Sequence, residues 1–196
     1  KQVAYEIFAM MNIRTNYEEY LEVCKAYLDS QQHPKRVKES ATLPTEERAA
    51  QKPFVVADCL YGFACNPCTF ACPHGGIVKR DTRSVPEIDY TKCVGCMECV
   101  THCPGLAIFG YDKSRSTIFL PVEYSVEKGA LVWLVDNNGK KLGEGSILSV
   151  IAKPNKTNLC RVKCDNLYEG TITDVRGFIV KENYPEAIEW KGVEDA

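Results

Sequence analysis

The stretch 59-CLYGFACNPCTFACP-73 decides the fold, together with a second stretch, 93-CVGCMECVTHCP-104. The second stretch is regular: two residues separate its first cysteine from the second and its second from the third, three residues separate the third from the fourth, and a proline follows. The first stretch keeps this spacing only from Cys65 onward, because Gly62 stands where a cysteine is due and Cys59 comes three residues too early. The first stretch is therefore either a damaged copy of the second or an intact copy with altered spacing.

Alignment of the two stretches favours an intact copy. Five residues in and after the first stretch match five in and after the second at one constant offset of 31: Cys65, Cys68, Cys72, Pro73 and Ile77 correspond to Cys96, Cys99, Cys103, Pro104 and Ile108. Cys59 corresponds to Cys93 at an offset of 34. We interpret this pattern as an internal duplication in which three residues were inserted before Cys65, so we expect a stretched site and not a broken one.

Cysteine usage narrows the class of protein. Eight of the 11 cysteines lie between residues 59 and 103. In a secreted protein this density would indicate disulfides. The odd count, the C-x2-C spacings and the lack of a recognisable signal peptide in the given sequence instead favour metal ligation in a reducing compartment, and we expect the cytoplasm. The sequence starts at Lys1, so we also expect that the natural start lies upstream.

Charge and hydropathy exclude two further classes. The net charge is −2, and no basic stripe of the kind that replaces counterions on nucleic-acid phosphates is present. No apolar run approaches the ~18 residues that a membrane-spanning helix needs. We therefore expect neither a nucleic-acid partner nor a membrane span.

The cysteine spacing has a chemical explanation. A cubane [4Fe–4S] cluster is held by four thiolates. Two residues between cysteines let the chain curl around such a cluster, and a glycine such as Gly95 permits close approach and unusual backbone angles. Zinc is the alternative metal, bound by four ligands in closed tetrahedral sites. Eight cysteines in two proline-ended runs fit a pair of cubane clusters better than zinc.

Residues 59–104 resemble a bacterial-type two-[4Fe–4S] ferredoxin, in which the fourth cysteine of each run ligates the cluster of the other run. The resemblance implies two ligand sets. The first set is Cys59, Cys65, Cys68 and Cys103, and the second set is Cys93, Cys96, Cys99 and Cys72. The resemblance also implies an α+β, ferredoxin-like βαββαβ domain whose strands include 76-GIVKR-80 and 106-LAIFGYD-112.

One cysteine of the runs and two histidines near them have specific interpretations. The long gap after Cys59 predicts a less protected corner, with a cluster that can lose one iron. His74 is a candidate substitute ligand there, although its place after Pro73 favours an exposed histidine. His102, which precedes Cys103, either tunes the cluster potential through a hydrogen bond or is a surface histidine, and we favour the surface.

We expect four segments along the chain. They are a helical N-terminal extension (1–52), the two-[4Fe–4S] ferredoxin domain (53–118), a small antiparallel β-barrel or sandwich (119–183) and an acidic C-terminal tail (184–196). The extension contains one clear amphipathic helix with Tyr17, Leu21, Cys24 and Leu28 on one face. In the tail, Trp190 is a candidate anchor on a partner.

The third segment contains several strand signals. Strands are predicted at 130-ALVWLV-135, 146-SILSVIAK-153, 159-LCRVKC-164 and 170-GTITDVRGFIVK-181, with a hairpin turn at 136-DNNG-139. Cys160 and Cys164 lie on one face of such a strand, and we expect core thiols there and not ligands. The glycines of 142-LGEGS-146 lack the strand–glycine–helix context of a dinucleotide fingerprint, so we interpret them as turn glycines.

The absence of a recognisable substrate or nucleotide motif favours electron transfer over catalysis by this chain. The additions on both sides of the clusters suit a subunit held in a larger enzyme. The pattern is also similar to that of iron–sulfur subunits of FAD-dependent proline- or hydroxyproline-type dehydrogenases, which implies flavoprotein (FAD) subunits as partners and single-electron transfer to or from them. The alternatives are a stand-alone ferredoxin with accessory domains, or a binding module with structural or regulatory clusters.

Overall fold

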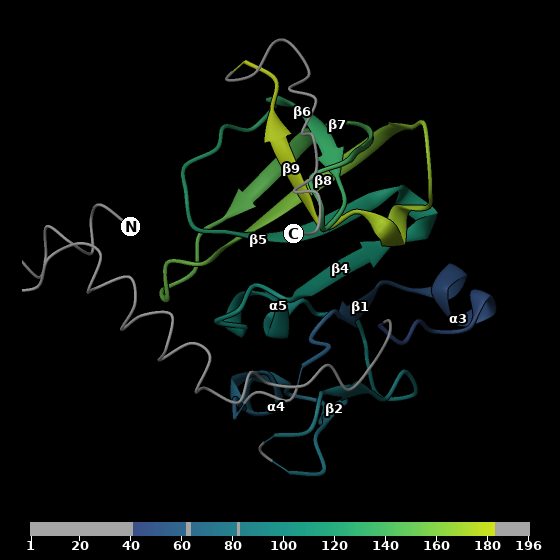
Figure 1. The fold of residues 1–196 in the computed structure, drawn as a ribbon, viewed down its shortest axis with the longest axis vertical. Helices are drawn as coiled ribbons and strands as arrows, with labels where there is room; N and C mark the ends of the chain where they lie inside the picture. Colours follow the sequence, from purple (N-terminus) through teal and green to yellow (C-terminus); the bar gives the residue numbers. More distant parts are fainter. Residues whose placement is uncertain (1–40, 62–63, 82, 183–196) are drawn as a thin grey trace, which may run out of the picture. The chain divides into compact units, whose positions relative to one another are not determined.

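The computed structural model describes residues 41–61, 64–81 and 83–182, coloured in Figure 1. The expected helix with Cys24 and the tail with Trp190 lie outside these residues. No helix in the described ranges combines the length and the apolar character needed to cross a membrane.

The elements of the cysteine-rich half come first in the chain. They are α3 (Glu46–Gln51), β1 (Phe54–Ala57), α4 (Pro67–Ala71), β2 (Ile77–Val78), β3 (Glu87–Ile88), α5 (Glu98–His102) and β4 (Ile108–Asp112). The elements of the second half follow. They are η1 (Lys113–Arg115), β5 (Thr117–Val122), β6 (Leu131–Val135), β7 (Lys141–Ile151), β8 (Asn158–Leu167), η2 (Ile172–Asp174) and β9 (Gly177–Val180).

The cysteine-rich half has the expected βαββαβ order, from β1 to β4. Strand β1 pairs with β4 and β2 pairs with β3, both antiparallel. The expected strands at 76–80 and 106–112 are confirmed as β2 and β4.

The two strand pairs are copies of each other. Ala57 lies opposite Ile108 in one pair, and Ile77 lies opposite Ile88 in the other. Adding 31 to Ala57 gives Ile88, and adding 31 to Ile77 gives Ile108. The offset of the cysteine runs therefore extends into the strands, and the two halves of the domain are related by an approximate twofold.

Strands β1 and β4 separate two hydrophobic cores, which explains why every residue of both strands is buried. Side chains alternate between the faces of a strand. Phe54 and Val56 pack into the core of the second half, whereas Val55 and Ala57 pack around the cysteines. The cysteine sites are thus fixed to one side of a sheet whose other side is also packed.

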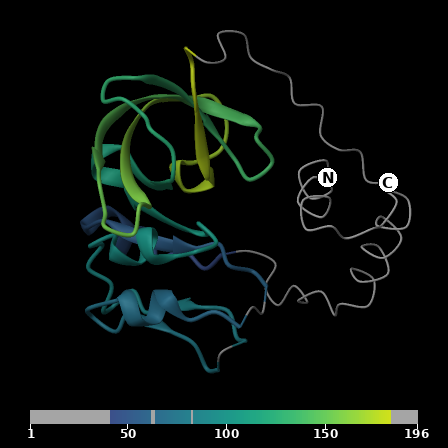
Figure 2. The same cartoon turned by 90° about the vertical axis from the view of Figure 1, so that its left-hand side faces the viewer.

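The sheet continues without interruption into the second half. Its strand order is β1-β4-β5-β8-β7-β6-β9, and all of its pairs are antiparallel. Figures 1 and 2 show β5 to β9 curled together on the side of β4 opposite to α4 and β2. Strand β5 spans the expected segment boundary between residues 118 and 119, and the division into segments stays a prediction.

Most strand predictions in this half are confirmed. Strands β6 and β8 lie at the expected places, β7 includes the predicted 146–151, and Gly139 has the positive φ of 78° expected in the turn between β6 and β7. The strand predicted over 170–181 is correct only at its end, because residues 172–174 form η2 and only 177–180 form β9.

The interpretation of 142-LGEGS-146 as turn glycines is wrong. Gly143 and Gly145 lie inside β7. A Cβ on Gly143 would collide with the carbonyl oxygen of Asn166, and one on Gly145 with that of Lys163. The register of β7 against β8 shifts next to Gly145, so these glycines permit close approach of β8 at a bulge.

Candidate functional site: two sets of four cysteines

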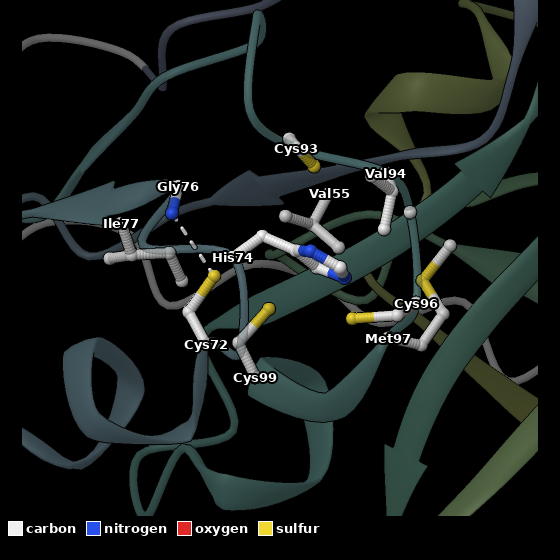
Figure 3. A pocket seen from close by; sticks show the side chains of 11 residues that line it. Val55, Cys72, His74, Gly76, Ile77, Cys93, Val94, Cys96, Met97 and Cys99 are labelled. Atoms are coloured by element: carbon white, nitrogen blue, oxygen red, sulfur yellow. Dashed lines mark hydrogen bonds between the residues drawn. The ribbon is translucent and has the colours of Figure 1, made fainter.

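The four thiols of the second set surround one pocket. Figure 3 shows Cys72, Cys93, Cys96 and Cys99 around this pocket, whose remaining walls are mostly apolar. These walls include Val55, Ile77, Val94 and Met97. Cys72 comes from the first run and the other three come from the second, so the pocket combines both runs.

The electrostatics of the pocket favour a positively charged occupant. Burial raises the pKa of the Cys99 thiol well above its ordinary value. Charge on Cys93 and Cys96 raises this pKa further, and charge on Cys72 does the same. Four thiolates in so small a space therefore require a cationic centre among them, which an iron–sulfur core supplies.

The thiols of the first set also gather. Burial raises the pKa of Cys59, and the nearby thiols of Cys103 and Cys65 raise it further. Burial, Cys103 and Cys65 act in the same way on Cys68. The set thus joins Cys103, from the second run, to three cysteines of the first.

Equivalent backbone amides support the exchanged cysteine of each set. The N–H of Gly76 donates to Cys72 Sγ at 3.2 Å, and the N–H of Ala107 donates to Cys103 Sγ at 3.3 Å. Both donors lie four residues after their cysteine, where the chain leaves α4 or α5. Such hydrogen bonds stabilise the thiolate form that ligates metal.

The comparison with protein families decides the identity of this segment. The model of the 4Fe-4S dicluster domain matches residues 61–108. Over residues 61–108 the chain is therefore similar to the 4Fe-4S dicluster domain family, and we call this segment the dicluster domain. The match begins two residues after Cys59, so it includes seven of the eight cysteines in the two sets.

Curated relatives match this chain over short segments. A selenate reductase subunit of Mesobacillus selenatarsenatis is 47% identical over 38 residues, which are 19% of this chain and 13% of the relative. A protein of Halobacterium salinarum named as an iron-sulfur subunit of a dimethyl sulfoxide reductase is 42% identical over 48 residues, 24% of this chain and 18% of the relative. A sulfite dehydrogenase subunit of Allochromatium vinosum is 45% identical over 38 residues, which are 19% of this chain and 16% of the relative. The matched segment spans less than a fifth of each relative, and no solved structure matches the chain.

Two equivalent hydrogen bonds in the dicluster domain show that the expectation of a three-residue insertion before Cys65 is wrong. The N–H of Asp58 donates to the carbonyl of Ala107, and the equivalent N–H of Asp89 donates to that of Gly76. Seven positions separate Asp58 from Cys65, and seven separate Asp89 from Cys96. The two connections are equally long, and the first has its cysteine three positions nearer to the strand.

Gly95 has the role expected of it in the dicluster domain. Its φ is 71°, and a Cβ at this position would collide with the carbonyl oxygen of Pro53. Only glycine meets both requirements without strain. Met97, two residues later, also has a positive φ, of 65°. Its side chain lines the pocket of the second set and lies next to Gly110.

Two cations contact the ligand runs, and no sequence motif indicated either of them. Lys79 Nζ donates to the carbonyl oxygen of Cys65 at 2.5 Å, and Arg48 Nη2 donates to that of Cys93 at 2.7 Å. The charge of Lys79 also lowers the pKa of Cys59 and Cys68, against the stronger effect of burial. Both contacts join residues at least 14 positions apart.

The sequence left two interpretations for each of the two histidines, a role at a cluster and a place on the surface. His74 is exposed, as its place after Pro73 favoured, and it lines the pocket of the second set, so the alternative of a substitute ligand beside Cys59 has no support. His102 is exposed, and its Nδ1 lies 2.8 Å from the carbonyl oxygen of Glu98 within α5. The surface interpretation of His102 therefore agrees with the structure.

The remaining cysteines belong to the core. Cys160 and Cys164 are buried on β8 and pack in the core of the second half, as expected. All ten cysteines among the described residues are free thiols. Across the described ranges, no three His, Cys, Asp or Glu side chains gather closely enough to hold a single metal ion.

Proposed function

We propose that this chain transfers electrons one at a time through two [4Fe–4S] clusters, as a subunit of a larger oxidoreductase. The observation that carries the proposal is the gathering of eight cysteines into two sets of four, each built from both runs. Cys59, Cys65, Cys68 and Cys103 hold one cluster. Cys93, Cys96, Cys99 and Cys72 hold the other.

A bound [4Fe–4S] cluster supplies one-electron redox chemistry whose potential depends on hydrogen bonds and exposure. The thiolates of each set bind the four iron corners. The amides of Gly76 and Ala107 donate to ligand sulfurs. Val55 and Met97 limit water around the second set, since both are almost fully buried in its wall. Lys79 and Arg48 place positive charge beside the two sets.

The partner that we propose is a flavoprotein subunit. Three relatives that match short segments of this chain carry names of subunits of reductases or of a dehydrogenase, which supports a place in a multi-subunit enzyme. A flavin exchanges electrons in pairs or singly, and two neighbouring one-electron centres suit such a donor or acceptor. The exclusively free cysteines among the described residues suit a reducing compartment, and we propose the cytoplasm.

Metal analysis of anaerobically purified protein tests the proposal. We expect about eight iron and eight acid-labile sulfide per chain, since each cubane contains four of each. We also expect reversible reduction by a reduced flavoprotein and a spin-coupled EPR signal from two neighbouring clusters. One zinc per chain, or no sulfide, would refute the electron-transfer function.

Two cysteine variants sharpen this experiment. Cys99→Ser removes a buried ligand of the second set, so we expect loss of that cluster and of about half of the iron. Cys160→Ser is the matched control, because Cys160 is equally buried but lies in the other core. Clusters that bind but cannot be reduced reversibly would favour a structural role. A stable monomer that exchanges electrons rapidly with several unrelated flavoproteins would favour a stand-alone ferredoxin.

A further inference from the structure

Asp58 and Asp89 occupy equivalent positions but make different contacts. Each follows a paired strand and donates its N–H to the strand partner. Asp89 then folds its own loop: its carboxylate accepts from the N–H and hydroxyl of Thr91 at 3.0 and 2.6 Å, and its carbonyl accepts from the N–H of Cys93 at 2.9 Å. This local turn places Cys93, the first cysteine of its run.

The carboxylate of Asp58 contacts the second half of the protein. It accepts from Arg176 Nε at 2.8 Å and from Asn137 Nδ2 at 2.8 Å. The Asp58 and Arg176 side chains are only 9% and 13% exposed. The next residue after Asp58 is Cys59, so these two hydrogen bonds connect the displaced cysteine to loops between the curled strands.

Arg176 is itself rigidly held. Its Nη1 donates to the hydroxyl of Tyr111 at 2.8 Å and to the carbonyl of Thr173 at 2.5 Å, and its guanidinium stacks over the ring of Phe109. These contacts fix the position and orientation of the guanidinium whose Nε donates to Asp58. Because Arg176 is held in this way, its hydrogen bond to Asp58 also restricts the position of the next residue, Cys59.

We propose that Arg176 positions Cys59 through Asp58, so that the β strands of the second half align the first ligand set. This inference rests on the proposed function, because it requires Cys59 to ligate a cluster. The second half of the protein would then place Cys59, just as the local turn at Asp89 places Cys93. It also explains how a cysteine moved by three positions can still be presented reproducibly.

The test is an Arg176→Met variant, purified anaerobically and compared with Cys59→Ser. We expect both variants to lose one iron per chain on brief treatment with ferricyanide. In that oxidation a [4Fe–4S]²⁺ cluster releases one Fe²⁺, gives one electron to ferricyanide and becomes [3Fe–4S]⁺, which has its own EPR signal. The EPR signal of the second set, measured in the reduced protein, should not change.

A double variant separates positioning from stability. Arg176→Met leaves the nearly buried carboxylate of Asp58 without this cation, which destabilises the fold. Asp58→Asn combined with Arg176→Met removes the charge as well, so thermal stability should recover while the loss of iron persists. Lys153→Met is the matched control, since Lys153 forms another ion pair between the second half and the cysteine-rich half, to Glu98 at 2.8 Å. We expect this variant to keep both clusters intact.

The outcomes are distinct. If the double variant retains eight iron after ferricyanide, or if it loses both clusters equally, Arg176 does not position Cys59. If Arg176→Met is unfolded, the double variant decides. If the unmodified protein contains one zinc or no acid-labile sulfide, the proposed function fails before this inference is reached, whereas seven iron in the untreated protein would show that Cys59 does not hold its corner and would overturn this inference alone.

Discussion

Lys79 donates from Nζ to the carbonyl oxygen of Cys65 at 2.5 Å, whereas the equivalent position in the second half of the dicluster domain is Gly110. The second set has its own cation, Arg48, which donates to the carbonyl of Cys93. Arg48 also binds the carbonyls of Lys52, Pro53 and Tyr90. The approximate twofold of the backbone thus does not extend to the charges.

We expect Lys79→Met to lower the potential of the first cluster. Reduction adds a negative charge, which a neighbouring cation stabilises, so removal of the cation disfavours the reduced form. A tenfold change in this equilibrium corresponds to about 59 mV for one electron, and we expect a shift of roughly that size in a redox titration followed by EPR.

The control for this titration is Lys163→Met. Lys163 lies on β8 and donates to the carbonyl of Arg115, remote in the fold from both ligand sets. The potential of the second cluster should be the same in both variants. Equal shifts of both clusters on loss of Lys79 would contradict a local effect.

Gly95→Ala should destabilise the protein by about 1–3 kcal/mol, the cost of strained backbone at a non-glycine residue. The new Cβ would also collide with the carbonyl of Pro53, so the loop between Cys93 and Cys96 must move and iron binding by the second set should weaken. Gly105→Ala is the matched control, because a Cβ there meets open space. Urea unfolding and iron content measure both effects, and equal behaviour of the two variants would refute the prediction.

Tyr111→Phe tests the buried contact between the two halves. The Tyr111 hydroxyl donates to the carbonyl of Val175 and accepts from Arg176, both at 2.8 Å. Loss of a hydroxyl that leaves buried partners unsatisfied costs about 1–3 kcal/mol. The partly exposed Tyr124 supplies the control Tyr124→Phe, for which we expect a change below about 0.5 kcal/mol in the free energy of unfolding.

Cys160 predicts a pH dependence of stability. Burial raises the pKa of this thiol from 9.0 to about 12. Because the folded pKa exceeds the unfolded one, the stabilisation is complete below about pH 9 and is lost as the pH rises towards about 12. Cys160→Ala should therefore show a smaller loss of unfolding free energy across this range than the unmodified protein. Parallel curves for the two proteins would show that Cys160 does not contribute.

Local repetition in the sequence predicted much of the fold, whereas the grouping of the cysteines into two sets was implied by the resemblance to two-cluster ferredoxins. The offset of 31 relates the two halves in sequence and in strand register alike. Alternation of apolar residues identified β6 and β8. Each of these signals lies within a few residues of the feature that it predicts.

The errors and omissions depend on contacts between distant residues. An insertion before Cys65 was inferred only because the register of β1 and β3 was not visible in the sequence. Gly143 and Gly145 were misread because the approach of β8 was unknown. The contacts of Arg48 and Arg176 extend over 45 and 118 positions to Cys93 and Asp58, and no motif relates such pairs.

The continuous sheet has a mechanical consequence for electron delivery. Strand β5 pairs with β4 on one side and β8 on the other, so no flexible hinge separates the cysteine sites from the curled strands. A carrier on a swinging arm reaches its partners by sampling many orientations. If the proposed partner binds the curled strands, it also orients the cysteine sites, and one docking orientation would then set the distance of each electron transfer.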